Sequence, residues 1–176
     1  MTNDPLWKKC AEFHGHECPG LTIGYKASLL AAKLLGTGFS HDERLVCISE
    51  NDACGIDAIS VLLGCSLGKG NLLFHMTGKQ AFSFYDRESP RSFRLVLKPF
   101  GPFASKADAF EYYHSLTPEE MFDVKETSIK LPQKAAVFQN IVCPVCGESF
   151  AEGFAKITGG RALCPDCAHT FSRFNV

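Results

Sequence analysis

Two cysteine pairs near the end of the chain restrict its folding more than any other part of the sequence. Each pair has the form C-P-x-C, and together they give the pattern C-x2-C-x17-C-x2-C. The four residues are Cys143, Cys146, Cys164 and Cys167. A C-P-x-C turn directs both of its sulfur atoms toward one ion, and zinc accepts four thiolates in a tetrahedral shell. The spacing therefore predicts a structural zinc site with no coordination position left for a substrate.

The segment that carries these cysteines, residues 134–176, is too short to build a hydrophobic core of its own. Metal binding must therefore supply much of its folding free energy. We expect a treble-clef zinc finger in which a helix follows the second cysteine pair, with a zinc ribbon as the competing form. A redox-active pair of C-x-x-C motifs and an iron–sulfur cluster are the alternatives to zinc.

The charge of this segment bears on its partner. Residues 130–176 hold five Lys and Arg residues against three Asp and Glu residues, and the whole chain has a net charge of −1. A zinc ion with four thiolates adds a charge of about −2. Because no basic surface results, nucleic acid is not favoured as a partner. We expect the zinc finger to contact a protein instead.

The nine cysteines of the chain also bear on where the protein works. The N-terminal residues lack the positive segment and apolar run of a signal peptide. No apolar stretch reaches the roughly 18 residues that a membrane-spanning helix needs. We therefore expect a cytoplasmic protein. Disulfides rarely persist in such a reducing compartment, where cysteines more often bind metals or act as reactive thiols.

Residues 1–133 have the pattern of an α+β domain, a mixed β-sheet flanked by helices. Helices are expected within residues 18–36, 51–65, 105–116 and 117–124, and strands within 44–50, 71–76, 79–86, 92–100 and 125–131. Pro19 and Gly36 mark the ends of the first helix, and Asn51 or Asp52 is expected to cap the second. The strands at 71–76 and 79–86 are expected to form a hairpin.

A second group of metal-binding residue types surrounds the expected start of the first helix, in the stretch "FHGHECPG". Cys18 precedes Pro19, and Cys54 falls in the first turn of the next expected helix, where unpaired N–H groups lower the pKa of a thiol. If the two helices start at the same edge of the sheet, both sulfurs could join His16 in a three-ligand site with one open position. The alternative is that these residues only cap helices or fill the core.

Other cysteines are assigned to structure. Cys10 and Cys47 fall on an apolar helix face and in a strand, so we expect them in the core. Cys65 lies about 16 Å from Cys54 along an intact helix. It therefore cannot share a metal ion with Cys54.

Several stretches in combination resemble the FmdE family, which is related to formylmethanofuran dehydrogenase. They are "FHGHECPGLTIGYKAS", "CGIDAISVLLGCSLGKGNL", "GKQAFSFYDRESPRSFRLVL" and the two C-P-x-C pairs. The similarity covers nearly the whole chain. It implies a thioredoxin-like α+β core and, in two-domain members, a C-terminal treble-clef zinc finger.

The resemblance also implies a site centred on the histidine and cysteine block and the downstream cysteine. In this chain these are His14, His16, Cys18 and Cys54, with Asp57 nearby. Some members of the family hold a metal ion there. The dehydrogenase itself uses molybdopterin and iron–sulfur subunits, for which this chain has no signature. The resemblance therefore favours an accessory or separately acting protein.

Three functions stay open at this point. The first is a metal-binding accessory protein in which His16, Cys18 and Cys54 hold zinc or another metal that prefers soft ligands. The second is a thiol-dependent enzyme whose nucleophile is Cys18 or Cys54, with a histidine as base. The third is a regulatory module that acts through its zinc finger on protein or nucleic acid. Self-association, as a dimer, is expected in each case.

Overall fold

The computed structural model describes residues 4–131, 134 and 136–168. It divides the chain into two compact units, Met1–Ala135 and Ala136–Val176, which are described separately below. Among the described residues, no helix is long and apolar enough to cross a membrane.

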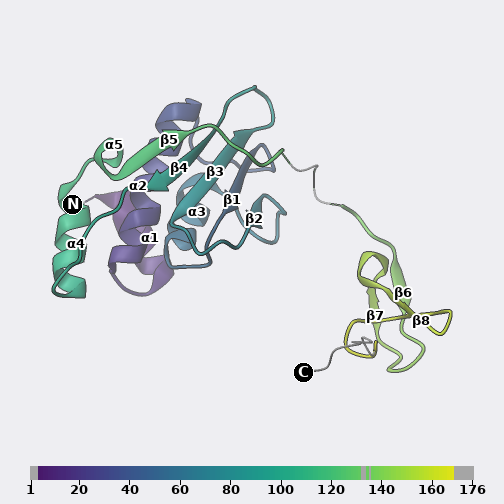
Figure 1. Cartoon of the computed structure of the whole chain (residues 1–176). Helices are drawn as coiled ribbons and strands as arrows, with labels where there is room; N and C mark the ends of the chain where they lie inside the picture. The colour runs from purple at the N-terminus through teal and green to yellow at the C-terminus, as the bar shows by residue number, and fades with distance from the viewer. Residues whose placement is uncertain (1–3, 132–133, 135, 169–176) are drawn as a thin grey trace. The chain divides into compact units, whose positions relative to one another are not determined.

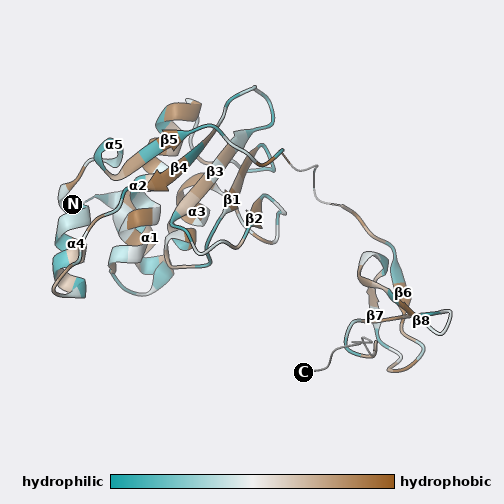
Figure 2. Cartoon of the chain, viewed as in Figure 1, coloured by the Kyte–Doolittle hydropathy of each residue, from teal (hydrophilic) through white to brown (hydrophobic). Residues whose placement is uncertain are grey.

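The first unit is built on a five-stranded mixed sheet with the order β2-β1-β3-β4-β5 (Figure 1). Its strands are β1 (Leu45–Ser49), β2 (Leu72–Phe74), β3 (Ala81–Asp86), β4 (Ser92–Leu97) and β5 (Phe122–Lys125). The β1–β2 pair is parallel, and β3, β4 and β5 continue the sheet as antiparallel neighbours. The central strands are rich in hydrophobic residues (Figure 2). The α+β class with a mixed sheet is thereby confirmed.

Helices lie on one face of this sheet (Figure 1). They are α1 (Pro5–His14), α2 (Pro19–Leu35), α3 (Gly55–Leu63), α4 (Lys106–Ser115) and the short α5 (Pro118–Met121). The first of them, α1, packs on α2 and α3 and not on the strands. The main hydrophobic core lies between α2, α3 and the sheet, where Leu30, Ile59 and Phe82 are almost fully buried. Cys10 and Cys47 are also fully buried, as expected.

The ends of α2 follow directly from the sequence. Cys18 is the N-cap residue, and its sulfur accepts a hydrogen bond from the backbone N–H of Leu21 at 3.3 Å. Pro19 occupies the first helical position, where a missing N–H costs nothing. Gly36 ends the helix with φ +71°, a conformation that favours glycine. These three residues place the Cys18 side chain at the N-terminal end of a rigid helix.

Three expectations about local structure were wrong. The strands β2 and β3 do not form a hairpin, because β1 lies between them and pairs with both. The last strand covers Phe122–Lys125 and not residues 125–131, because α5 ends at Met121. The N-cap residue of α3 is Cys54. The Asn51 side chain accepts from the N–H of Ala53 instead and closes a turn before the helix.

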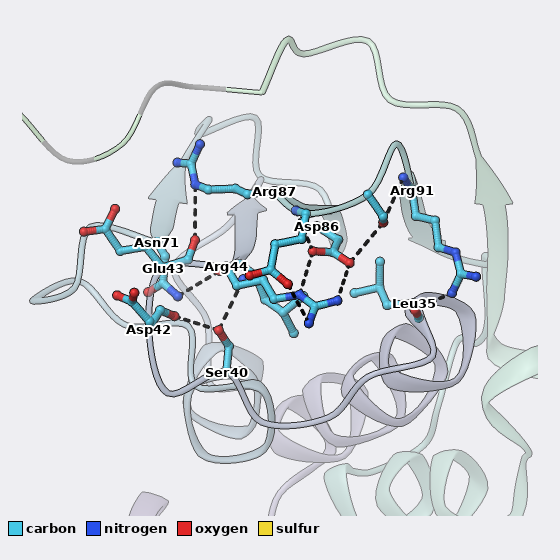
Figure 3. Close-up of polar contacts among 12 residues, drawn as sticks. Leu35, Ser40, Asp42, Glu43, Arg44, Asn71, Asp86, Arg87 and Arg91 are labelled. Atoms are coloured by element: carbon cyan, nitrogen blue, oxygen red, sulfur yellow. Dashed lines mark hydrogen bonds and ion pairs between the residues drawn. The ribbon is translucent and has the colours of Figure 1, made fainter.

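The C-terminal end of α2 and the segment that follows it are tied to β3 and the turn after β3 (Figure 3). Arg44 binds both carboxylate oxygens of Asp86, with its Nε and Nη2 atoms at 2.8 and 2.9 Å. This pairing holds the pKa of the buried Asp86 carboxyl well below its usual range. Arg91 donates to the backbone carbonyl of Leu35 at 2.6 Å. The contacts fix α2 relative to β3 and the turn that follows it.

The second unit consists of two small hairpins. One pairs β6 (Asn140–Val142) with β7 (Ser149–Ala151), and the other pairs β8 (Lys156–Thr158) with β9 (Arg161–Leu163). A 3-10 turn, Glu152–Phe154, connects them. The hydrophobic cluster of this unit is very small and includes Cys143, Leu163 and Cys164. The helix expected after Cys167 falls on residues 169–176, outside the described ranges.

Candidate functional site

The histidine and cysteine residues of "FHGHECPG" converge at the junction of α1 and α2. His14 is the last residue of α1, His16 lies in the connecting turn, and Cys18 caps α2. One ligand atom from each of the three lies within 4.8 Å of the others. Three elements of local structure therefore bring an N/N/S donor set together without any other part of the chain.

A carboxylate from α3 orients one of these donors. His14 Nδ1 lies 2.7 Å from Asp57 Oδ2, and His14 Nε2 lies 3.7 Å from Cys18 Sγ. A proton on Nδ1 that is donated to Asp57 leaves the lone pair of Nε2 directed toward the cysteine. A carboxylate partner on the outer nitrogen is the usual arrangement for a metal-binding histidine.

The spacing of the donors fits a metal ion. Zn–S and Zn–N bonds of about 2.3 and 2.0–2.1 Å at a tetrahedral angle place the two ligand atoms about 3.6 Å apart. The observed separation of His14 Nε2 and Cys18 Sγ is 3.7 Å. The residues present could therefore hold a zinc ion with little movement of either side chain.

Close approach of two helices brings Cys54 next to Cys18. Gly24 of α2 meets Gly55 of α3 backbone to backbone, and a Cβ atom on Gly24 would lie 1.9 Å from the Gly55 carbonyl oxygen. At the neighbouring Gly20, a Cβ atom would lie 3.5 Å from Cys54 Sγ and 3.9 Å from Cys18 Sγ. The two sulfurs thus lie on either side of Gly20, where a side chain would also press on the Cys54 Cβ atom at 3.1 Å.

The electrostatics of Cys54 differ from the expectation. Burial raises its pKa, and the neighbouring Cys18 thiol raises it further through a hydrogen bond and its charge. The expected lowering of this pKa by the start of α3 is therefore wrong. The reason is that burial and the Cys18 thiol outweigh the start of the helix, to which the Cys54 side chain makes no capping bond.

The structure groups the site residues somewhat differently from the sequence interpretation. His14 joins His16 and Cys18 in the closely spaced donor set, with Asp57 behind it. Cys54 lies outside that set of three, although its sulfur is near Cys18.

A cavity of about 670 Å³ opens beside the cluster. It is lined by His16, Cys18, Pro19, Gly20, Cys54, Phe103, Ser105, Lys106, Ala109 and Tyr113. Its size is that of a typical small-molecule site. Sequence reasoning did not identify the wall that residues 103–113 provide, because no local pattern links them to the distant cysteines. The expected helix at 105–116 was the one available signal.

The four cysteines of the second unit form a separate group. One sulfur from each of them lies within 4.8 Å of the others, and Cys146 Sγ is 3.9 Å from Cys164 Sγ. Two sulfurs on one tetrahedral zinc ion are about 3.8 Å apart. Backbone N–H groups from Cys146, Cys164 and Val145 lower the pKa of Cys143 to about 6, while hydrogen bonding to Cys164 raises that of Cys167 to about 12. The group can therefore hold one metal ion after the remaining thiols lose their protons.

Comparison with known proteins gives three findings. A family model described as "FmdE, Molybdenum formylmethanofuran dehydrogenase operon" matches residues 13–140. A probable S-adenosyl-L-methionine-binding protein from Archaeoglobus fulgidus is 28% identical over 198 residues, which cover 94% of this chain and 53% of that protein. The chain thus spans about half the length of this curated relative.

The third finding is a similar crystal structure. It is that of a tungsten formylmethanofuran dehydrogenase FmdE-like protein from Syntrophus aciditrophicus. The TM-score is 0.70 with 26% sequence identity, and the match covers 91% of this chain and 88% of the other.

Proposed function

This chain belongs to the FmdE family, and from this premise we propose that its first unit is a metal-dependent accessory protein related to formylmethanofuran dehydrogenase. His14, His16 and Cys18 hold the ion. A ligand in the adjoining cavity, or the Cys54 sulfur, takes the remaining coordination position. Two imidazoles and a thiolate suit zinc, Cu(I) or Fe(II) better than magnesium, and zinc is the ion that we propose.

The contact between Asp57 and His14 carries this proposal. The position of His14 at the end of α1 does not by itself explain why its Nδ1 atom, on the side of the ring away from Cys18, lies 2.7 Å from the Asp57 carboxylate. The same pairing is what a metal-binding imidazole requires, because it fixes the tautomer and raises the basicity of the other nitrogen. A bound ion would supply Lewis-acid chemistry or an activated water at the cavity.

A thiol-dependent enzyme is the second candidate, and the closeness of Cys18 and Cys54 favours it. Both sulfurs line the open cavity, and His16 lines it too. A histidine beside a cysteine could accept the thiol proton as a covalent bond to substrate forms. In that case iodoacetamide would modify one of the two cysteines rapidly, whether or not a metal is present.

The remaining proposals concern the fold and the second unit. We propose a thioredoxin-like arrangement for the first unit and a structural zinc finger of the treble-clef type for the second, which contacts a protein partner. We further propose that the protein is a homodimer in the cytoplasm, where thiols stay reduced. S-adenosyl-L-methionine, named in the description of the Archaeoglobus relative, is a candidate ligand of the cavity.

The test of the metal proposal is the metal content of the chain. Protein is purified without oxygen or chelator, and the ions per chain are counted by mass spectrometry for three proteins: the wild type, Cys18→Ala/Cys54→Ala, and His41→Ala as a control outside the site. We expect about two ions in the wild type and the control, and about one in the double variant, because only the four-cysteine site remains intact. One ion in all three proteins would contradict the core metal site and favour the thiol enzyme.

A further inference from the structure

We propose that the cavity beside the cluster binds a small organic anion with an apolar or aromatic body, and that Lys106 is the residue that recognises the negative group. This inference deepens the proposed function, because the body of the ligand would bring its reacting end to His16, Cys18 and Cys54. Three observations support it. They are the apolar surface of the cavity wall, the positive charge of its lining residue Lys106, and the absence of an ion pair at that lysine among the described residues.

The apolar surface comes from the segment around α4. Phe103 and Tyr113 pack against each other with ring centroids 5.4 Å apart, and both line the cavity with Ala109. The ring of Phe100 also packs edge-on with that of Tyr113, with the ring centroids 6.0 Å apart. These ring contacts hold Phe103 and Tyr113 together along the wall. Such a surface suits a flat or apolar group.

The charge of the cavity is carried by one side chain. Lys106 lines the 670 Å³ cavity, and no aspartate or glutamate lines it. A second cavity of about 350 Å³ shares His16, Cys18 and Lys106 with the first, and there Glu17 joins the lining. The Glu17 carboxylate accepts a hydrogen bond from Trp7 Nε1 at 2.6 Å. Both spaces are therefore lined by Lys106 together with His16 and Cys18 of the cluster.

Lys106 is also free to bind. Within the described parts of the chain it forms no ion pair, whereas Lys33 and Arg94 are each paired with a glutamate. An ammonium group at the mouth of an apolar cavity gains most from a ligand that offers an anion next to an apolar surface. A carboxylate or a phosphate provides this chemistry equally well.

Two related dyes test the proposal on the full, metal-loaded chain. 8-Anilinonaphthalene-1-sulfonate carries an anion, and N-phenyl-1-naphthylamine has the same aromatic body without it. Fluorescence titrations give the dissociation constants for the wild type, Lys106→Gln, Lys106→Arg and Phe103→Ala, with Lys125→Gln as the matched control. Lys125 is an exposed lysine on β5 outside both cavities.

We expect Lys106→Gln to weaken binding of the sulfonate dye about fivefold, the effect of one partly exposed ion pair. Binding of the neutral dye should not change in that variant. Lys106→Arg should keep the affinity for the anionic dye, and Phe103→Ala should weaken both dyes. Equal losses in Lys106→Gln and Lys125→Gln would overturn the proposal, as would unchanged binding of the sulfonate dye in Lys106→Gln.

The metal content of the same samples separates this proposal from the function on which it rests. If the core holds no ion but Lys106→Gln still weakens only the anionic dye, the anion site stands and the metal proposal fails. If the core holds its ion but Lys106→Gln has no effect on either dye, the metal proposal stands and the anion site is wrong.

Discussion

The two cysteine-containing clusters of this chain bring potential metal ligands together by different routes. In the second unit, Cys143 and Cys164 begin tight turns that directly follow the short strands β6 and β9, and the unit has almost no hydrophobic core. In the first unit, His14, Cys18 and Asp57 come from α1, the start of α2, and α3, which pack against one another through a buried cluster around Trp7 and Tyr25. We infer that the four-cysteine cluster depends on its ion for structure, whereas the core cluster gains its geometry from the fold.

Their coordination capacity differs in the same way. The four cysteines can fill a tetrahedral shell by themselves, so no position remains for chemistry. The core set has three closely spaced donors and opens into a cavity. A closed shell is typical of a structural ion, and an open one is typical of an ion that meets a substrate.

Loss of a ligand in the second unit should have the largest effect. Cys143 is the most buried of its four cysteines, and Cys143→Ser removes one of the four ligands of an ion that, in our proposal, would supply much of the folding free energy of this unit. We expect residues 136–168 to lose protection in amide hydrogen exchange, while α2 and β3 keep theirs. Retained protection in the second unit would show that its fold does not depend on the ion.

The close contact of α2 and α3 should be nearly as sensitive. Gly24→Ala places a methyl group 1.9 Å from the Gly55 carbonyl oxygen, so the helices must separate, at a cost of about 3 kcal/mol. Unfolding in urea should show this loss, and the core should release its ion while the four-cysteine site keeps its own. Gly38→Ala is the matched control, because its new methyl group would meet no atom within 4 Å. Equal stability of the two variants would contradict the role of this contact.

Removal of the carboxylate behind His14 should have a moderate effect. Asp57→Asn leaves the shape of the side chain but weakens the hydrogen bond to Nδ1, so affinity for the core ion should fall about 10- to 100-fold. Competition with a chromogenic chelator measures the change, with the exposed Asp52→Asn as control. An unchanged affinity in Asp57→Asn would mean that Asp57 does not support a metal ligand.

The smallest effect is expected for substitutions of Cys18, which caps α2 and is also a ligand in the proposed metal site. A serine at this position keeps a capping oxygen for the N–H of Leu21, whereas an alanine does not. We expect both Cys18→Ser and Cys18→Ala to lose the core ion and to stay folded. The alanine variant should have a free energy of unfolding about 1 kcal/mol lower than the serine variant, and it should therefore unfold at a lower urea concentration. If the two variants are equally stable, the capping bond of Cys18 does not contribute to the stability of the fold, and the proposed metal site is the remaining role of this residue.

The same contrast explains how much could be predicted from the sequence. The four-cysteine group was predictable because its geometry depends on short spacings, and the bounds of α2 were predictable from Pro19 and Gly36. The β1–β2 pairing was not predictable in this way, because a helix separates the two strands in the chain. The same holds for the Asp57–His14 contact and for the cavity wall at Phe103, which depend on tertiary packing.

The raised pKa of Cys54 illustrates the limit of local reasoning. Its place at a helix start suggested a thiolate, but burial and the nearby Cys18 thiol have the larger influence. Neither of these influences is visible in the residues that flank Cys54.

The backbone contact between Gly24 and Gly55 also bears on how fast each ion would exchange. At this point α2 and α3 meet backbone to backbone, so packing of the fold holds Cys54 and Asp57 of the α3 region beside Cys18 and His14. An ion in the core could therefore enter and leave through the cavity while the protein stays folded. An ion bound by the four cysteines could leave only as its unit opens. The two ions of one chain would then exchange with isotopically labelled zinc on different timescales, the core ion first.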